Sequence, residues 1–535
     1  MKSYTTSFLC QHERGASLSG QLIKSTAMVG VMTLVSRILG FIRDMVIARY
    51  FGADAATDAF FVAFRIPNFM RRLFAEGSFA QAFVPMLSDY RENSDRAGLK
   101  LFLDRASGSL ALLVLLISLA GVIAAPLLIL LFAPGFLGQE GQFDLSSAML
   151  RITFPYLFFI TLTAFAGGIL NASGRFAIPA FTPAVLNMVM IVAAIWLAPL
   201  MPVPVTALAW GVLFAGMAQL ALQLPALMAA GLLPRPRFGF SDPDVRRLLK
   251  RMAPAIFGVS VTQVNLLVDT LIASFLMSGS VSWLYYSDRL VEFPLGVFGV
   301  AMGTAILPHL AKSHAKQDDA GFSKTIDWGL RWVLLIGLPA TVGLMVLAEP
   351  LMSTLFQYDE FGSRDVTMAG RSLMTYSTGL IGFIAVKILA SGFNARHDLN
   401  TPVRHGVYSM LANLLLCVVL VYPLTKFDYG HAALALSTAL AALFNALLLL
   451  HRLIKDGIFQ PRPGWFAYLL RLLLGNGALG LFLLYFTADL PWEAWGGRER
   501  VTWLMVWIAA GGSVYFATLG LVGLRPAQLK LKEDA

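Results

Sequence analysis

The sequence predicts an all-α integral membrane protein of about fourteen transmembrane helices, arranged as two pseudo-symmetric six-helix lobes plus two C-terminal helices. Composition, the charge pattern of the loops and an internal repeat support this prediction. The 535 residues are 57% hydrophobic and 13% charged, with a mean hydropathy of +0.70, whereas soluble domains carry about 25% charged residues. This number of charged residues is too small to cover the surface of a soluble protein of this size. We therefore expect much of the surface to face lipid.

Windows of about 20 mostly apolar residues, the length that a bilayer span needs, recur along the chain. They lie near 27–50, 57–86, 107–133, 150–171, 179–200, 205–231, 252–277, 283–310, 329–349, 368–393, 404–424, 431–451, 465–487 and 502–523. The first, second and eighth windows contain charged residues. Residues 1–20 are polar and have no apolar core, so they are not expected to form a signal peptide.

Loop charges predict the orientation of these spans. Alternate loops are basic, with Arg91, Arg96, Lys100 and Arg105 after the second span and Arg235, Arg237, Arg246 and Arg247 after the sixth. The intervening loops 134–145 and 357–366 are acidic, and 199–205 and 278–282 carry no charge. Under the positive-inside rule both termini are cytoplasmic, which requires an even number of spans. The net charge of +10 then reflects cytoplasmic loops and buried arginines, and no nucleic-acid partner is expected.

A sparse internal repeat divides the chain. Three residue pairs share an offset of 223, and a fourth pair has an offset of 225: Asn171 with Asn394, Pro179 with Pro402, Pro85 with Pro308, and Asp44 with Asp269. We expect a polar N-terminal extension (1–20), an N-lobe of six spans (21–235), a C-lobe of six spans (236–455) and a C-terminal part with the last two spans and a tail (456–535). Because six spans is an even number, the lobes would be parallel repeats with a substrate path between them.

Three predicted spans carry charged and polar side chains that lipid would not accept, since a charge at the bilayer centre costs roughly 2.5–3.5 kcal/mol. We expect them to line a water-filled cavity or, in the structural alternative, to snorkel or form internal ion pairs. The excess of arginine favours an anionic substrate, because a guanidinium matches phosphate oxygens. The candidate substrate-binding residues are Arg37, Arg43, Arg71 and Arg289, and the candidate cavity or gating residues are Asp58, Asn68, Glu76, Asp288 and Glu292.

Several long motifs resemble one known family. They are SRILGFIRD (36–44), ATDAFFVAF (56–64), IPNFMRRLFAEGSFAQAFVPML (66–87), ITFPY (152–156), SGSVSWLYYSDRLVEFPLGVFGVAMGTAILP (278–308) and GFNARHDLNTPV (392–403). The chain closely resembles the MurJ (MviN) family of lipid II flippases, in the MOP superfamily, from about residue 21 to beyond residue 520. Residues 1–20 resemble an extension beyond the usual family start.

The resemblance implies a flippase that moves lipid II, the undecaprenyl-pyrophosphate-linked muropeptide, from the cytoplasmic to the periplasmic leaflet of the bacterial inner membrane. It assigns the essential cavity arginines to Arg37, Arg43, Arg71 and Arg289, and the functional acids to Asp58 and Glu292. It also implies that the last two helices form a groove for the lipid tail. Membrane lipids and the cell-wall synthesis machinery are the other partners that we expect.

Two other functions remain open from the residues alone. One is a MOP-type exporter of a drug or another lipid-linked oligosaccharide, although a cationic drug would favour net acid. The other is a membrane glycosyltransferase, which would need a cluster of catalytic acids at a membrane face. The only such pair in a loop is Asp318 and Asp319, and the neighbouring lysines suggest a solvated cytoplasmic loop instead. Cys10 and Cys417 are far apart, and the chain contains no Walker motif and no HExxH. We therefore expect no catalytic residue, no metal site and no cofactor, with transport driven by a coupling ion or the membrane potential.

Overall fold

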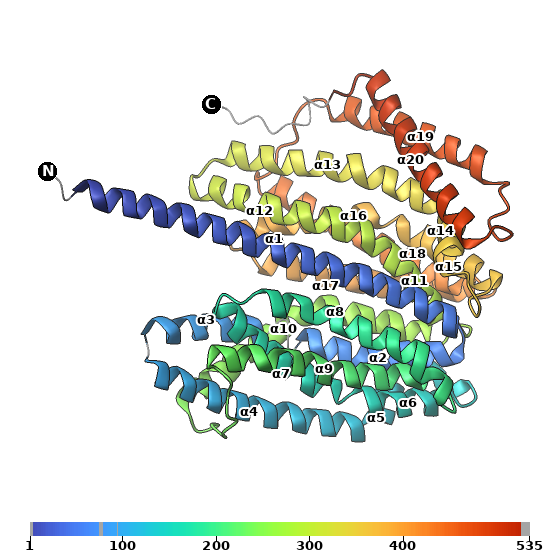
Figure 1. The fold of residues 1–535 in the computed structure, drawn as a ribbon. Coiled ribbons are helices and arrows are strands. Elements are labelled where there is room, and N and C mark those ends of the chain that lie inside the picture. The colour runs from blue at the N-terminus through green and yellow to red at the C-terminus, as the bar shows by residue number, and fades with distance from the viewer. Residues whose placement is uncertain (1–3, 74–78, 94, 526–535) are drawn as a thin grey trace. The chain divides into compact units, whose positions relative to one another are not determined.

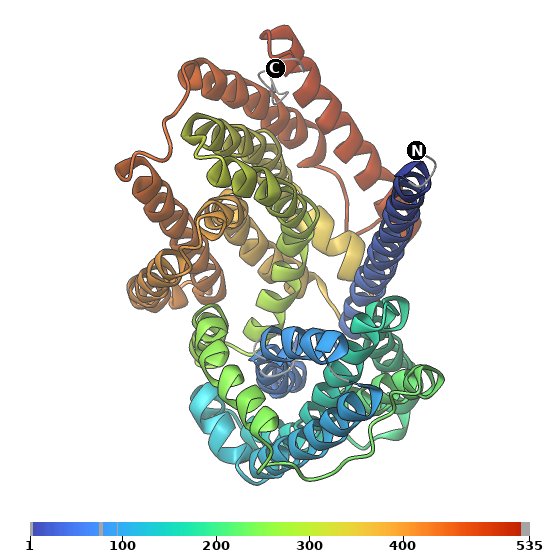
Figure 2. The same cartoon turned by 90° about the vertical axis from the view of Figure 1, so that its left-hand side faces the viewer.

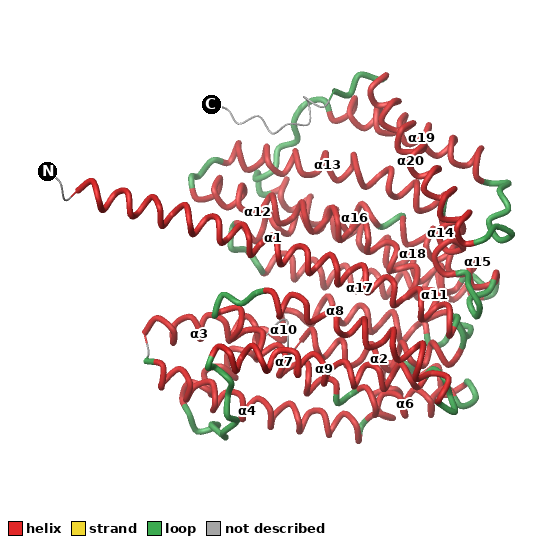
Figure 3. Tube along the Cα trace, in the orientation of Figure 1, coloured by secondary structure: helices red, strands yellow, loops and turns green. Residues whose placement is uncertain are grey.

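The computed structural model describes the backbone of residues 4–73, 79–93 and 95–525, and the side chains of residues 28–73, 79, 82–93, 95–252 and 265–525. Within these ranges the regular elements are helices and no strand occurs (Figure 3). The predicted all-α class is therefore confirmed. Helix α1 (Tyr4–Phe51) joins the predicted polar extension and the first predicted span in one helix.

Ten helices of the described part are long and apolar enough to cross a membrane, or eleven if the bent pair Ser363–Ser377 and Leu380–Ala395 forms one span. They match eleven of the fourteen predicted windows, so the chain is a multi-pass membrane protein. The other three windows, near 27–50, 57–86 and 252–277, each include residues whose side chains are outside the described ranges. The count of fourteen and the two-lobe arrangement remain predictions.

Several of the predicted spans are interrupted helices, and the third and eighth spans show two kinds of interruption. The third span begins earlier than predicted, as α4 (Arg96–Ile123), and continues after one residue as α5 (Ala125–Phe132). Pro126 lies at this break and has no backbone N–H to continue the helical hydrogen bonds. The eighth span consists of α11 (Ser280–Pro294), a π-helical turn (Leu295–Gly299) and α12 (Val300–Ala315). Such π turns accommodate an extra residue in a helix, here directly after a proline.

The chain folds into two compact units that alternate along the sequence. The first unit contains Met1–Ile47, Val62–Leu130 and Gly141–Ser260, and the second contains Ala48–Phe61, Leu131–Glu140 and Val261–Ala535. Helices α2 (Ala55–Arg71) and α10 (Pro243–Ala273) each contribute residues to both units. The predicted division into four parts remains a prediction.

The first unit is a helical bundle built around α7 (Tyr156–Ala172) and α9 (Thr206–Ala230). Helix α7 packs against α9 and α4, and α9 also packs against α6 (Gln142–Thr153) and α8 (Ala177–Val192). Helix α3 (Phe79–Asn93) contributes Phe79 and Phe83, whose stacked rings contact Phe165 of α7. The core of this unit is therefore aromatic on its α3 side.

The segment between α9 and α10 lies along α4. The buried side chain of Asp104 accepts a hydrogen bond from the Arg235 backbone N–H (2.7 Å), and its carbonyl accepts one from the Arg237 N–H (2.9 Å). Ser109 Oγ accepts another from the N–H of Gly239 (2.9 Å). These bonds satisfy backbone donors of an extended segment, and they explain why the start of α10 groups with the first unit.

The second unit packs its helices around α16 (Leu380–Ala395) and α18 (Gly430–Lys455). Helix α18 contacts α15 (Ser363–Ser377), α16 and α17 (Asn400–Thr425), and α16 also contacts α12 and α13 (Asp319–Val346). The short helix α14 (Ala348–Phe356) packs against α15. Small residues line α18, including buried Ala432, Ala433 and Ala435, and they permit the close approach that membrane helices favour.

The last two helices, α19 (Trp465–Thr487) and α20 (Gly497–Leu521), pack against each other and against α13 in the second unit (Figures 1 and 2). Tyr468 donates a hydrogen bond to the Arg331 carbonyl (2.6 Å), and Tyr515 donates one to the Leu335 carbonyl (2.8 Å). The hairpin is thus fixed to α13 by buried tyrosine hydroxyls as well as by apolar contact.

Local geometry agrees with the predicted repeat. Helix α7 ends with a hydrogen bond from Arg175 N–H to the Leu170 carbonyl (2.9 Å), and α16 ends with one from Asp398 N–H to the Phe393 carbonyl (3.0 Å). Both donor and acceptor positions differ by 223 residues. The left-handed residues of the two turns, Gly174 (φ 75°) and His397 (φ 60°), have the same offset. Both helices therefore end in the same Schellman-type turn.

Candidate functional site

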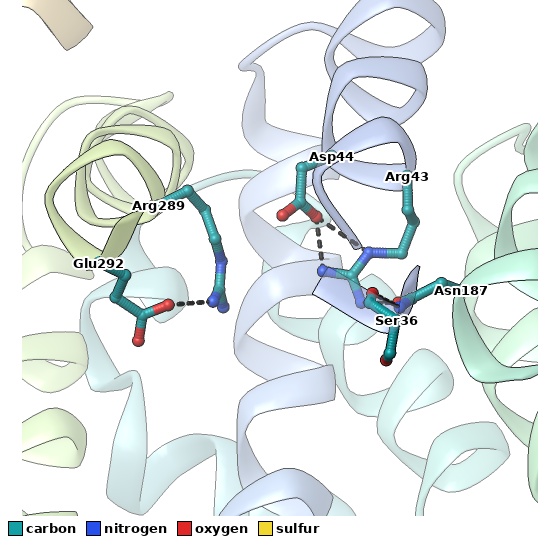
Figure 4. A network of polar contacts seen from close by, with 6 residues as sticks. All are labelled: Ser36, Arg43, Asp44, Asn187, Arg289 and Glu292. Carbon is teal, nitrogen blue, oxygen red and sulfur yellow. Dashed lines mark hydrogen bonds and ion pairs between the residues drawn. The ribbon is translucent and has the colours of Figure 1, made fainter. Parts of the chain in front are cut away.

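Arg43 of α1 lies in a buried polar network within the first unit (Figure 4). Its Nε and Nη2 donate to Asp44 Oδ1 at 2.9 and 2.5 Å, and its Nη1 donates to Asn187 Oδ1 of α8 at 3.0 Å. Arg43, Asp44 and Asn187 are 8%, 1% and 7% exposed. A buried ion pair is tolerated only when good geometry and further hydrogen bonds compensate for lost hydration. The second acceptor from α8 supplies such a bond.

Asn187 also fixes the spacing between α1 and α8. Its Nδ2 donates to the Ser36 carbonyl at 3.0 Å, and a Cβ placed on Gly40 would lie 3.3 Å from that nitrogen. Ser36, Gly40 and Asp44 follow one another at intervals of four residues and Arg43 lies three residues after Gly40, so all four lie on the same side of the helix. Three features of the SRILGFIRD motif therefore face Asn187: the Ser36 carbonyl, the space left by the missing side chain of Gly40, and the ion pair of Arg43 with Asp44.

Arg37 is exposed and lies six residues before Arg43 in the same helix. Among the described residues it has no hydrogen-bond or ion-pair partner within its unit. In α2, Arg71 is half-buried and its Nε donates to Asn68 Oδ1 at 2.9 Å. The structure therefore brings together two predicted site residues, Asn68 and Arg71. Glu76 lies outside the described residues.

Asp58 caps the N-terminus of α11 within the second unit. Its carboxylate is 2% exposed and accepts hydrogen bonds from Gly279 N–H (2.8 Å), Ser282 N–H (2.8 Å) and Ser282 Oγ (2.6 Å). The first backbone N–H groups of a helix have no partner inside it, and the helix dipole favours an anion there. Asp58 contacts no arginine in the described part of the chain, so its visible role is to hold α11 to the start of α2.

The turn before α11 explains why the cap comes from another helix. Gly279 has φ +94°, a conformation that glycine adopts without strain, and its Cα lies against the Ala53 carbonyl, which would be 2.6 Å from an added Cβ. Gly279 has no side chain with which to cap its own helix. Asp58 therefore supplies the missing acceptor.

Arg289 and Glu292 lie together on α11 in the second unit (Figure 4). Arg289 Nη1 is 2.5 Å from Glu292 Oε2, and its guanidinium carbon is 4.7 Å from the ring centroid of Tyr285. Tyr285 in turn stacks on Phe61 with centroids 4.0 Å apart. Residues 285, 289 and 292 share one helix face, as their spacing predicts. Asp288 is half-buried beside Arg289 in sequence.

The first unit thus holds Arg37, Arg43 and Arg71, and the second holds Asp58, Arg289 and Glu292. Their predicted convergence on one substrate remains a prediction. Sequence reasoning missed two residues of the site, Ser282 and Asn187. No sequence pattern distinguishes Ser282, whereas a pattern was available for Asn187. Asn187 is the polar residue in the apolar run AVLNMVMIV, and intramembrane polar residues often have a function.

A second buried polar cluster lies in the second unit. Asn413 of α17 donates from Nδ2 to Asp269 Oδ1 (2.9 Å) and to Asn265 Oδ1 (3.0 Å), and Thr438 of α18 donates to Asp269 Oδ2 (3.2 Å). Asp269 is the predicted repeat partner of Asp44. In the part of the chain that the structure describes, no group of three or more His, Cys, Asp or Glu side chains could hold a metal ion.

Comparisons with known proteins agree with these features. The sequence model of the family "Lipid II flippase MurJ" matches residues 47–499. A probable lipid II flippase MurJ of Vibrio cholerae is 44% identical over 522 residues, covering 96% of this chain and 98% of that protein.

Solved structures show the same architecture. A lipid II flippase MurJ in an inward closed conformation superposes with a TM-score of 0.77 at 25% identity, covering 92% of this chain and 98% of that one. An inward-facing multidrug resistance MATE family transporter of the MOP superfamily superposes with a TM-score of 0.66 at 12% identity, over 81% of this chain and 98% of that one, which shows a shared fold. The near-complete match in sequence and fold means that the chain belongs to the lipid II flippase MurJ family.

Proposed function

We propose that this protein translocates lipid II, the undecaprenyl-pyrophosphate-linked muropeptide, from the cytoplasmic to the periplasmic leaflet of the bacterial inner membrane. The observation that carries the proposal is the 44% identity to a probable lipid II flippase over almost the whole of both chains. The buried and half-buried arginines of α1, α2 and α11 support it, because a guanidinium fork matches the oxygens of a pyrophosphate.

In this proposal Arg37, Arg43, Arg71 and Arg289 bind the pyrophosphate and sugar headgroup. Asp58 and Glu292 have supporting roles: the Asp58 carboxylate holds the N-terminus of α11, and Glu292 pairs with Arg289. Fourteen spans form two six-helix lobes that alternate between inward-open and outward-open states, while α19 and α20 provide a groove for the polyprenyl tail. An ion gradient or the membrane potential drives the cycle, and the cell-wall synthesis machinery takes up the product.

No bond is made or broken in the proposed cycle, so the protein is a transporter and not an enzyme. Purified protein in liposomes should move lipid II between leaflets and return it chemically unchanged, as measured by headgroup accessibility and by mass spectrometry. Recovery of a cleaved or glycosylated product would favour a membrane enzyme. Transport of cationic drugs without transport of lipid II would favour a MOP-type exporter.

The proposed orientation places both termini and the basic loops in the cytoplasm. In a background without Cys10 and Cys417, a cysteine at Glu92 should react only with membrane-permeant reagents, and one at Glu140 should also react with impermeant reagents in intact cells. Both positions are exposed, so each can be labelled. Labelling of position 140 only after the membrane is permeabilised would reverse the orientation.

A further inference from the structure

Asn187 uses both ends of its amide in the buried network of the first unit. Its Oδ1 accepts from Arg43 Nη1 at 3.0 Å, and its Nδ2 donates to the Ser36 carbonyl at 3.0 Å (Figure 4). The second bond fixes which way the amide faces, since only Nδ2 can donate to a carbonyl. The oxygen is therefore held toward the guanidinium.

Asp44 alone would not fix the plane of that guanidinium. Arg43 Nε and Nη2 both donate to one oxygen, Asp44 Oδ1, so the guanidinium could still pivot about this atom. The contact of Nη1 with Asn187 adds a second fixed point from a different helix. Asp44 on α1 and Asn187 on α8 together hold the Arg43 guanidinium in one orientation. A preorganised binding site requires side chains that are held in this way.

The predicted repeat allows Asn187 to be compared with an asparagine, Asn413, in a unit that has a valine at the position corresponding to Arg43. Asn413 is 226 residues after Asn187, and Asp269 is 225 residues after Asp44. In the second unit the Asn413 amide donates directly to the Asp269 carboxylate at 2.9 Å. Position 268, equivalent to Arg43, is a valine.

The two units thus share an asparagine and an aspartate at equivalent positions but use them differently. In the second unit the amide nitrogen of the asparagine faces the acid, whereas in the first unit the oxygen faces the guanidinium that pairs with the acid. The amide of Asn187 therefore faces the opposite way from that of Asn413, and its oxygen faces a guanidinium that the second unit lacks at the corresponding position.

We propose that Asn187 is a positioning residue for lipid II binding, which it supports by holding the guanidinium of Arg43 in a fixed orientation. This inference rests on the proposed function. Asn187 acts through Arg43, so its contribution should disappear when Arg43 is absent. A residue that only joined α1 to α8 would instead contribute to stability whether or not Arg43 is present.

Titration of lipid II against the purified full-length protein tests the proposal. Asn187→Ala should weaken lipid II binding about tenfold, since the lost hydrogen bond involves a charged group. In an Arg43→Ala background the same change should have no further effect. The temperature of unfolding, measured on each variant, identifies any loss of binding that comes from loss of structure.

Gly40→Ala provides a second variant that leaves Asn187 in place. Its added Cβ would lie 3.3 Å from Asn187 Nδ2, so it should displace the amide and weaken binding in the same direction. Gly30→Ala is the matched control in the same helix, because nothing lies within 4 Å of its added Cβ. This control should bind like the unmodified protein.

The outcomes separate the inference from the proposed function. Absence of lipid II binding by the unmodified protein would contradict the proposed function itself. If the unmodified protein binds lipid II, the inference fails when Asn187→Ala binds equally well. It also fails when that change weakens binding equally with and without Arg43.

Discussion

Asp58→Ala is expected to abolish transport and to lower the unfolding temperature. The change removes the carboxylate that caps α11 and leaves the N–H groups of Gly279 and Ser282 without their acceptor. Both donors belong to buried residues, and each unsatisfied donor costs about 1–3 kcal/mol. Growth complementation and thermal unfolding of the purified protein measure the two effects.

Asp54→Ala is the matched control for this change. Asp54 is exposed, and its carboxylate caps its own helix through Thr57 N–H at 2.7 Å. Loss of such a local cap costs about 0.5–2 kcal/mol, so this variant should retain transport with a smaller loss of stability. Equal stability of the Asp58 and Asp54 variants would show that the cap on α11 is not important for the fold.

Alanine at Arg37, Arg43, Arg71 or Arg289 should prevent growth complementation while the protein still reaches the membrane. Removing the charge of Arg37, Arg71 or Arg289 lowers the cost of membrane insertion, whereas Arg43→Ala also takes the guanidinium away from the buried Asp44 carboxylate and should lower stability. Each lost charged contact with the substrate should weaken binding about 10- to 100-fold. Complementation and the amount of protein in the membrane should be scored for every variant. Full complementation by all four alanine variants would contradict the anion-binding role.

Lysine substitutions distinguish the arginines from one another. A lysine at position 43 cannot reproduce the three donations from one plane to Asp44 and Asn187, so Arg43→Lys should fail. At position 289 a lysine can still pair with Glu292, although it loses the flat contact with Tyr285, so a milder defect is expected. Arg49→Ala removes an exposed ion pair with Asp359 and should be nearly neutral.

The sequence predicted the membrane class and most of the spans because lipid exposure requires long apolar windows, which composition reveals directly. It did not predict where helices break. The window 107–133 appears continuous in hydropathy, yet Pro126 divides it into α4 and α5. Hydropathy averages over many residues and cannot detect the loss of one backbone donor.

The sequence also identified the charged residues of the candidate site but not their partners. The pairing of Arg289 with Glu292 follows from helical spacing, so it was accessible from the sequence. The contacts of Asp58 with Ser282 and of Arg43 with Asn187 join residues 224 and 144 positions apart. Such contacts depend on tertiary packing, which no local pattern encodes. For the contact of Arg43 with Asn187 one sequence signal was available, because Asn187 and Asn413 are separated by nearly the same number of residues as Asp44 and Asp269.

The leaflet in which lipid II accumulates after depletion of this protein decides whether it is the translocator. We expect lipid II to accumulate in the cytoplasmic leaflet, inaccessible to a reagent or enzyme added from the periplasm, and expression of the unmodified protein but not of the Arg43→Ala variant to release it. Accumulation of lipid II that is accessible from the periplasm, or an unchanged lipid II pool, would contradict the proposed function.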